Sequence, residues 1–315
     1  MNIERNIVAK FGGSSVANVE GFIRVADIIN EDSRRRVIVL SAPGKDKDNP
    51  VKITDLLIIC GEASFMNLPF RDTRNVVERR FLGIAGGLGV YIDEDLEELK
   101  NGLLVRKESK EFSVAWVASR GEWLSGKILA RYLGAKFVDA AEIIKFQNDG
   151  TFDQGESYRL ISQMLIGSER FVIPGFYGRD RNGRIRIFPR GGSDITGGYL
   201  AAAMNAEIYE NWTDVDGVKT ADPKIVSQTR TIPFLGYEEM AELGFLGAKV
   251  LHPSAIEPVW DKGIPVNIRN TFNPGHQGTW IGFLSNKHIR ASLNEEKNIP
   301  DQIPVSSGVT VRSCI

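Results

Sequence analysis

The sequence predicts an α/β fold of three layers, in which helices cover both faces of a mostly parallel sheet. Short apolar runs alternate with stretches of helical periodicity along most of the 315 residues. Several of these runs are apolar throughout, which is typical of strands buried on both faces. The 32 glycines exceed the usual share of about 7% and gather where predicted strands end. Ligands of such sheets bind at the carboxyl ends of the strands, so we expect the site there.

The first half of the chain supplies four predicted strands. The apolar run at 7–11 is followed by glycines and then by helical spacing from Val19. A polar loop follows the second strand, and a helix begins near Thr54. Another helix is expected over 124–133, after a strand and a Ser-Arg-Gly-Glu segment. The predicted strands cover residues 7–11, 37–40, 112–118 and 171–176, and residues 185–188 fit a hairpin partner.

The second half repeats this order. A helix of small residues is expected over 190–205, a strand over 208–212, a helix over 248–260 and a strand over 265–268. From about residue 286 the chain becomes polar and loses its periodicity. We see no long internal repeat.

Composition excludes several classes of protein. The 39 basic and 40 acidic residues nearly cancel, which argues against a general nucleic-acid or membrane-surface binder. Cys60 and Cys314 are isolated, so a disulfide framework and a zinc ribbon are both excluded, and the cytoplasm is the expected location. The longest segment without charge, 270–286, holds a proline, glycines and a histidine, so no membrane span is expected.

Two glycine-rich segments suit anions. Lys-Phe-Gly-Gly-Ser-Ser at 10–15 places a cation and two glycines between a strand and a helix, where backbone N–H groups bind phosphate. The alternative is a tight turn with a surface lysine. Arg190 to Gly197 is a second such segment, in which Arg190 can hold a carboxylate by two parallel hydrogen bonds. Ser193 and Asp194 could instead only cap the following helix.

Three further charged residues are candidates. Asp214 follows a hydrophobic strand and can hold a lysine or a magnesium ion near phosphates, although an Asx-turn is the ordinary alternative. Lys249 stands at a predicted helix start, where the helix dipole disfavours a cation, so a function explains it better. Glu122 could pair with a ligand's ammonium group or merely occupy a helix's first turn.

Four other patterns are set aside. The GxxxxGK match at 121–127 has Ile128 where magnesium binding needs Ser or Thr. The sequon at Asn211 is irrelevant without secretion. Arg34 to Arg36 are expected to be a solvated helix end. The three histidines show no metal-ligand spacing.

Taken in order, these segments resemble aspartate kinases of the amino-acid kinase superfamily. The resemblance covers about residues 5–285 and rests on the ordered set more than on any one motif. The matching segments are 10–16, 41–44 with Thr54 and Asp55, 119–122, 174–178, 190–194, 212–217, 221–224, 247–253 and 264–268.

The resemblance implies a carbamate-kinase-like fold and transfer of the γ-phosphoryl group of MgATP to the β-carboxylate of L-aspartate. The product would be 4-phospho-L-aspartate, at the entry to lysine, threonine and methionine synthesis. It also implies two lobes, an N-terminal one, 1–190, that binds the amino acid and a C-terminal one, 191–290, that binds the nucleotide. Residues 291–315 would be a tail or the truncated start of a regulatory region.

Matched position by position, the resemblance assigns roles to individual residues. Its catalytic residues are Lys10, Asp194, Asp214 and Lys249. Its aspartate-binding groups are Thr54, Glu122, Arg190, Gly191, Gly192 and Ser193. Its ATP-binding groups are Lys10, Gly12, Gly13, Ser14, Thr213, Asp214, Lys219, Lys224, Lys249 and Val250. The metal is expected to arrive with ATP, and Asp214 is the one possible protein ligand. Ser14, Lys219 and Lys224 stand where the family more often has threonine, tyrosine and arginine.

These roles give a mechanistic hypothesis. Lys10 and Lys249 flank the moving phosphoryl group, and Asp214 orients them. Arg190 holds an aspartate carboxylate, and Glu122 binds the α-ammonium. A carboxylate is already a nucleophile at neutral pH, so no general base is required.

Two alternatives stay open at this point. The chain could be another kinase of the superfamily that phosphorylates glutamate, N-acetylglutamate or a nucleotide, or it could be a non-catalytic ligand-binding remnant. The family usually continues into two ACT domains that bind lysine or threonine and aid dimerisation. We expect this polypeptide to lack complete ACT domains and feedback inhibition, with a homodimer as a possible assembly.

Overall fold

The architecture is a three-layer α/β sandwich. A computed structural model describes residues 6–105, 109–189, 191–222, 225–226, 228–247 and 250–295. Its main sheet has eight strands, in which every pairing but that of β10 with β11 is parallel. In spatial order they are β3 (Lys136–Phe137), β5 (Phe171–Pro174), β2 (Arg35–Leu40), β1 (Ile7–Phe11), β8 (Ile208–Thr213), β10 (Val266–Asn270), β11 (Thr279–Ile281) and β9 (Phe234–Leu235).

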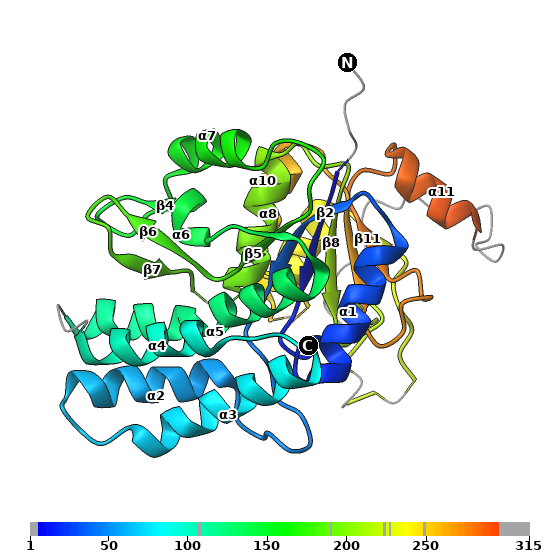
Figure 1. Ribbon diagram of the computed structural model, residues 1–315. Coiled ribbons are helices and arrows are strands. Elements are labelled where there is room, and N and C mark those ends of the chain that lie inside the picture. The colour runs from blue at the N-terminus through cyan, green and yellow to red at the C-terminus, as the bar shows by residue number, and fades with distance from the viewer. Residues whose placement is uncertain are drawn as a thin grey trace.

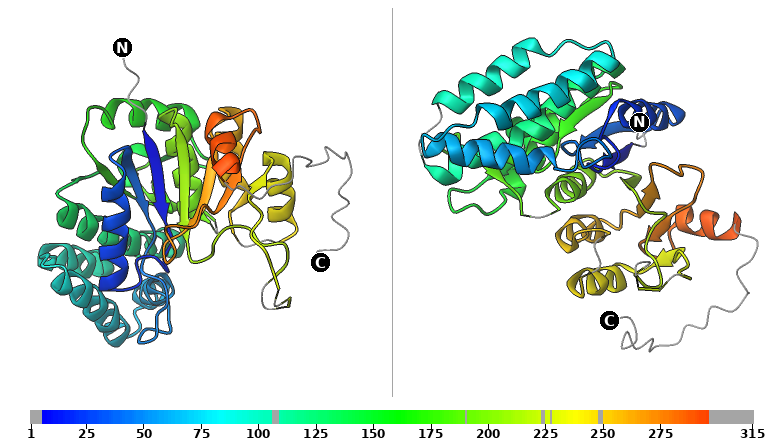
Figure 2. Two further views of the ribbon diagram at one scale, coloured as in Figure 1. Left: turned by 90° about the vertical axis from the view of Figure 1, so that its right-hand side faces the viewer. Right: turned by 90° about the horizontal axis from the view of Figure 1, so that it is seen from below.

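One face of the sheet is covered by a layer of long helices (Figures 1 and 2). Helix α5 packs directly on β5, β2 and β3, and the others stack around it. They are α1 (Val19–Glu31), α2 (Ile53–Phe65), α3 (Arg71–Gly87), α4 (Asp93–Val105) and α5 (Lys110–Leu133).

The opposite face is covered mainly by α8 (Gly192–Ala203), which packs on β1, β2 and β8. Around α8 lie α7 (Gln154–Met164), the 3-10 turn η1 (Pro253–Ala255) and α10 (Glu257–Asp261). Helix α9 (Tyr237–Phe245) contacts η1. Helix α11 (Lys287–Glu295) lies at the right of Figure 1, beyond β11.

A small second sheet lies beside α5 and α8. It contains β4 (Lys145–Phe146), β6 (Tyr177–Asp180) and β7 (Ile185–Ile187), with α6 (Ala140–Ile143) packed on β6. Strands β6 and β7 pair antiparallel, as expected of the predicted hairpin.

The core follows from the apolar runs. All five residues of β1 are buried, and Val37 to Leu40 of β2 are each at most 1% exposed. Strands that bury both faces bury more apolar area per residue than amphipathic ones, so they form the centre of the sheet. The predicted fold class and the strands at 7–11, 37–40 and 208–212 are therefore confirmed, whereas the strand predicted over 171–176 ends at Pro174.

The strand predicted over 112–118 is wrong. These residues belong to α5, one helix that starts at the N-cap Ser109 and ends at Gly134 in the left-handed conformation. The helix is buried on nearly every side between residues 115 and 126, because α2 and α4 cover one face of it and the sheets the other. An all-round apolar helix segment lacks the amphipathic period, so it resembles a buried strand in sequence.

Two smaller expectations also need correction. Residues 250–261 do not form one long helix, because the short η1 and α10 with their connecting residues replace it, while residues 248 and 249 lie outside the described residues. Arg35 is not a solvated helix end, because it is the first residue of β2 and is 5% exposed.

The two predicted lobes share the main sheet. Strand β1 pairs with β2 on one side and with β8, from the second lobe, on the other. The lobe boundaries therefore stay a prediction. No helix in the described part of the chain has the length and apolar character needed to cross a bilayer.

Candidate active site

The carboxyl ends of five neighbouring strands are joined into one continuous edge. Backbone hydrogen bonds continue past the last paired residue of each strand, so the loops leave the sheet in fixed positions. These bonds run from Gly12 N to Trp212 O (3.0 Å), Ser41 N to Phe11 O (3.1 Å), Gly175 N to Leu40 O (2.9 Å) and Thr271 N to Thr213 O (2.9 Å).

The glycine-rich segment after β1 forms a tight turn, residues 12–15. Ser15 N donates to Gly12 O at 3.0 Å, and helix α1 begins only at Val19, where the Asn18 side chain caps it. The predicted helix N-terminus is thus displaced from the glycines. In the described residues the N–H groups of Gly13 and Ser14 donate no hydrogen bond, so the turn itself offers two donors to an anion.

This turn lies in contact with the loop after β2. Gly44 N donates to Gly13 O at 2.8 Å. A Cβ on Gly13 would come within 2.8 Å of Ala42 O, and a Cβ on Gly44 would come equally close to Gly13 O. Both positions therefore require glycine because two backbones meet there.

Lys10 extends from β1 into the α8 side of this edge. It is 7% exposed, and its Nζ lies 2.6 Å from Asp194 Oδ1 and 3.5 Å from Asn211 Oδ1. A buried ammonium is unfavourable unless it is paired and hydrogen bonded. Asp194 and Asn211 supply those partners.

The start of α8 brings Asp194 to that position. Gly191 has φ of 78° and forms the N-cap, and no side chain caps the helix. A Cβ on Gly191 would lie within 2.5 Å of His252 Cβ. The capping alternative for Ser193 and Asp194 is thus not observed. Asp194 instead accepts a hydrogen bond from Asn211 Nδ2 at 2.9 Å and pairs with Lys10.

Glu122 approaches the same edge from the other helix layer. It lies in the middle of α5, not at a strand end as expected, and is 5% exposed. Burial raises the pKa of its carboxyl to about 8, although a hydrogen bond from the Ala42 N–H opposes this. Among the described residues, Glu122 Oε2 has no hydrogen-bond partner. The site thus holds a buried carboxyl group with one free oxygen.

The start of α2, which holds Thr54, packs on α5 beside Glu122. Thr54 is the second residue of α2, whose first turn has no side-chain cap. A Cβ on Gly121, next to Glu122, would touch both Ala42 and Ile53, so α5 and the start of α2 meet at the loop after β2. Gly192 and Ser193 lie across the edge in the first turn of α8, where Ser193 packs on Gly175.

The predicted nucleotide residues follow β8. Thr213 Oγ1 donates to Asp214 Oδ1 at 3.2 Å, and the Asp214 side chain is exposed. Lys219 Nζ donates to Thr231 Oγ1 at 2.7 Å and lies 3.9 Å from Asp216. Val250 is half-buried. Arg190, Lys224 and Lys249 lie outside the described residues.

Asn211 is a site residue that sequence reasoning missed. Its amide contacts both Lys10 and Asp194, and it is 1% exposed. The signal was present, because Asn211 is polar within an otherwise buried strand and directly precedes Trp-Thr-Asp. A buried amide must find partners, so its position in β8 indicated a polar neighbour.

The amino acid kinase family model matches residues 5–270. The chain belongs to the amino acid kinase family. Aspartokinase 3 of Bacillus subtilis is 35% identical over 286 residues, which cover 87% of this chain and 63% of the relative.

Solved structures of this family agree in fold. The aspartate kinase of Clostridium acetobutylicum superposes with a TM-score of 0.82 at 43% identity, over 90% of this chain and 64% of that one. E. coli aspartokinase III, solved in complex with aspartate and ADP, gives a TM-score of 0.80 at 28% identity, over 90% and 65%. The chain thus spans less than two thirds of the length of these relatives.

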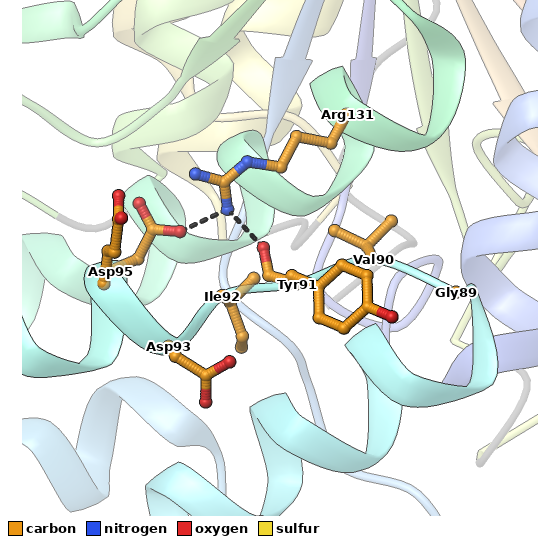
Figure 3. Close-up of a pocket in the computed structure, with 8 residues that line it drawn as sticks. Gly89, Val90, Tyr91, Ile92, Asp93, Asp95 and Arg131 are labelled. Carbon is orange, nitrogen blue, oxygen red and sulfur yellow. Dashed lines mark hydrogen bonds and ion pairs between the residues drawn. The ribbon is translucent and has the colours of Figure 1, made fainter.

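A separate hollow of about 540 Å³ lies over the turn between α3 and α4, lined by residues 89–95 and Arg131 (Figure 3). Arg131 Nη1 donates to Tyr91 O at 2.8 Å and pairs with Asp95, whose other oxygen is 3.6 Å from Lys127 Nζ. The Asp95 carboxylate thus binds two cations of α5 and ties α4 to α5. None of the predicted site residues lines this hollow.

Proposed function

We propose that the chain is the catalytic part of an aspartate kinase, which transfers the γ-phosphoryl group of ATP to the β-carboxylate of L-aspartate. The bond between the γ-phosphorus and the oxygen bridging to ADP breaks, a bond from that phosphorus to an aspartate oxygen forms, and ADP leaves. The product is 4-phospho-L-aspartate, the start of lysine, threonine and methionine synthesis, and the cytoplasm stays the expected location.

One observation carries this proposal. At a single edge of the sheet lie a buried lysine paired with Asp194, a turn with two N–H groups that donate to no described residue, and a buried carboxyl with one oxygen that has no partner among the described residues. The lysine and the turn suit a phosphate, and the carboxyl suits an ammonium. An ATP-dependent kinase of an unblocked amino acid needs both. The relatives named aspartokinase support the same choice.

On the phosphate side, the N–H groups of Gly13 and Ser14 would bind phosphoryl oxygens. Lys10, held by Asp194 and Asn211, would stabilise the charge that develops on the transferred group. Thr213 ends β8, and Asp214 and Lys219 follow it. These three residues would contact the nucleotide, and Lys224, Lys249 and Val250 complete the proposed nucleotide contacts.

On the amino-acid side, Glu122 would bind the α-ammonium of aspartate. Thr54 and the first turn of α8, with Gly191, Gly192 and Ser193, would bind carboxylate oxygens, together with Arg190. The attacking β-carboxylate is ionised at neutral pH, so these residues need only hold and orient it.

Magnesium would enter with ATP. The exposed Asp214 carboxylate, two residues after Trp212, whose carbonyl accepts from Gly12 N at the start of the 12–15 turn, fits a single protein ligand to a phosphate-bound ion. The ion, when bound, neutralises phosphate charge and orients the γ-phosphoryl group.

An aspartyl-hydroxamate assay with MgATP tests the proposal. Product that depends on aspartate, ATP and this chain supports it. A panel that includes glutamate, N-acetylglutamate and UMP, with ADP detection, tests the alternatives. Turnover of one of these in preference to aspartate, or ligand binding without any turnover, would replace the proposal.

A further inference from the structure

A buried arginine lies beneath the active-site loops and takes no part in the proposed chemistry. Arg80 is in α3, and its side chain is 4% exposed. Burying a guanidinium is costly, because it loses its hydration. The ion pair described for it, with Asp46, is long at 3.9 Å. Arg80 must therefore be stabilised mainly by other groups.

Those groups are backbone carbonyl oxygens from three segments. Nη1 donates to Val51 O at 3.1 Å, and Nη2 donates to Ala17 O at 3.1 Å and to Gly44 O. A planar guanidinium can serve three carbonyls at once because its donors diverge in a fixed fork. A lysine ammonium on a single stem lacks that span.

Each of the three carbonyls belongs to a segment that positions a proposed ligand group. Ala17 follows the 12–15 turn and precedes the N-cap of α1. Gly44 is in backbone contact with Gly13 in that turn. Val51 lies three residues before Thr54. The Arg80 guanidinium thus joins the 12–15 turn to the start of α2.

A backbone hydrogen bond within the loop between β2 and α2 also holds these segments together. Ile53 N donates to Pro43 O at 3.3 Å, so the loop between β2 and α2 returns to its own beginning. With Arg80 below it, this loop is held at both ends, at Gly44 and at Val51. Arg80, this hydrogen bond and the one from Gly44 N to Gly13 O together hold the 12–15 turn at its distance from Thr54. Arg80 is not among the residues proposed to bind either substrate.

We propose that Arg80 is a positioning residue for phosphoryl transfer, which sets the spacing between the 12–15 turn and Thr54 by binding the carbonyls of Ala17, Gly44 and Val51. This inference rests on the proposed function. It deepens that function by naming the group that aligns the nucleotide side with the amino-acid side.

The test compares Arg80→Ala and Arg80→Lys with Arg79→Ala, a matched control at an exposed arginine on the same helix. Misplacing reacting groups by about 1 Å can cost about 10²-fold in rate. We therefore expect kcat of both Arg80 variants to fall by about 30-fold or more, with each KM changed by less than about fivefold. Low concentrations of guanidinium should restore part of the kcat of Arg80→Ala, and Arg79→Ala should match the wild type.

A wild-type kcat in folded Arg80→Lys would overturn the inference, as would a low kcat in folded Arg80→Ala that guanidinium does not raise. If Arg80→Ala does not fold, Arg80→Lys decides. Amide hydrogen exchange provides a measurement without turnover. The Gly44 and Ile53 amides should exchange faster in Arg80→Lys than in Arg79→Ala, and equal exchange rates would contradict the inference. A wild-type chain that phosphorylates no aspartate would overturn the proposed function, and the exchange comparison would still test the role of Arg80.

Discussion

The ammonium nitrogen of Lys10 lies 2.6 Å from a carboxylate oxygen of Asp194, and both side chains are mostly withdrawn from water. The pair joins the first strand of the sheet to the first turn of α8. Because Asp194 holds the ammonium in place before any phosphate arrives, the charge that would stabilise a transferred phosphoryl group needs no reorganisation. The first prediction concerns this pair.

Replacing Lys10 by alanine should abolish aspartate phosphorylation, with a loss in kcat of about 10³-fold or more. Asp194→Asn keeps the shape but leaves Lys10 without its counter-charge, and we expect a loss of about 10²-fold. Coupled ADP detection at saturating substrates measures both. Lys136→Ala, at the exposed first residue of β3, is the control and should retain full activity. Near-normal turnover in Lys10→Ala would remove Lys10 from the mechanism.

The second prediction concerns Asn211. Its amide donates to Asp194 and lies near Lys10, so Asn211→Leu leaves the pair without its third member. We expect kcat to fall by about tenfold, since one hydrogen bond to a charged group is worth about 1.5–3 kcal/mol. The KM for aspartate should change little, because Asn211 lies on the phosphate side. Steady-state kinetics measure this split, and a selective rise in the aspartate KM would contradict the assignment.

The sequence predicted the centre of the fold better than its helical layer. Strands such as β1 and β2 are apolar on both faces. A parallel strand covered by helices on both faces has a nearly continuous apolar sequence, so these strands could be recognised. The segment at 112–118 has the same pattern for a different reason, because α5 is enclosed by other helices and by both sheets. Hydrophobic periodicity shows which sides of a helix or strand face water. It therefore cannot distinguish a strand from a helix when both are buried on all sides.

The candidate site shows the same division. Glycines that meet another backbone, such as Gly13 and Gly44, follow directly from residue type and position. Asn211 and Arg80 act through partners from other segments of the chain, Lys10 and Asp194 in one case and three carbonyls in the other. The sequence pattern around a residue does not show partners of this kind. A polar residue in a buried setting is the available signal, and it shows only that some partner exists.

The third prediction concerns Glu122→Gln. The amide cannot neutralise an ammonium, so the aspartate KM should rise by about tenfold or more while the ATP KM stays within about twofold. Substrate titrations at fixed pH measure both constants. Equal changes in the two KM values would contradict the role of Glu122 as the ammonium-binding group.

The raised pKa of Glu122, about 8, adds a pH dependence of known sign. The free site holds a proton that aspartate binding must displace, so aspartate affinity should rise with pH up to about 8, by at most about tenfold per unit. The unliganded fold behaves oppositely. Its carboxyl keeps a proton that the unfolded chain releases above the ordinary pKa of 4.5, so stability falls as pH rises from there to about 8. Glu122→Gln should remove this slope and unfold at a higher temperature than wild type at pH 8. A lower melting temperature would show an ionised, paired Glu122.

The fourth prediction uses the contact between Gly13 and Gly44. In Gly44→Ala the new Cβ would lie 2.7 Å from Gly13 C and 2.8 Å from Ser14 N, so the two loops must separate. Because the 12–15 turn would bind phosphate, we expect the ATP KM to rise by about tenfold. Gly83→Ala is the control, since a Cβ there meets nothing within 4 Å. An unchanged ATP KM in Gly44→Ala would show that the turn keeps its shape without this contact.

The last prediction separates stability from chemistry. Arg35 Nε lies 2.7 Å from Glu210 Oε2, both side chains are 5% exposed, and Trp212 Nε1 also donates to Glu210 at 2.8 Å. Removing one member of a buried pair leaves an uncompensated charge, which costs about 3–5 kcal/mol. Glu210→Gln should therefore lower the free energy of unfolding by about that amount, measured by urea denaturation, while the folded fraction keeps its kcat. Arg269, 3.9 Å from Glu210, loses its counter-charge in this variant and in the double variant Arg35→Met/Glu210→Leu alike. The double variant also removes the Arg35 charge, so it should lose less stability than Glu210→Gln. A double variant less stable than Glu210→Gln would contradict this expectation. It would show that the ion pair adds more to the free energy of unfolding than apolar side chains in its place do.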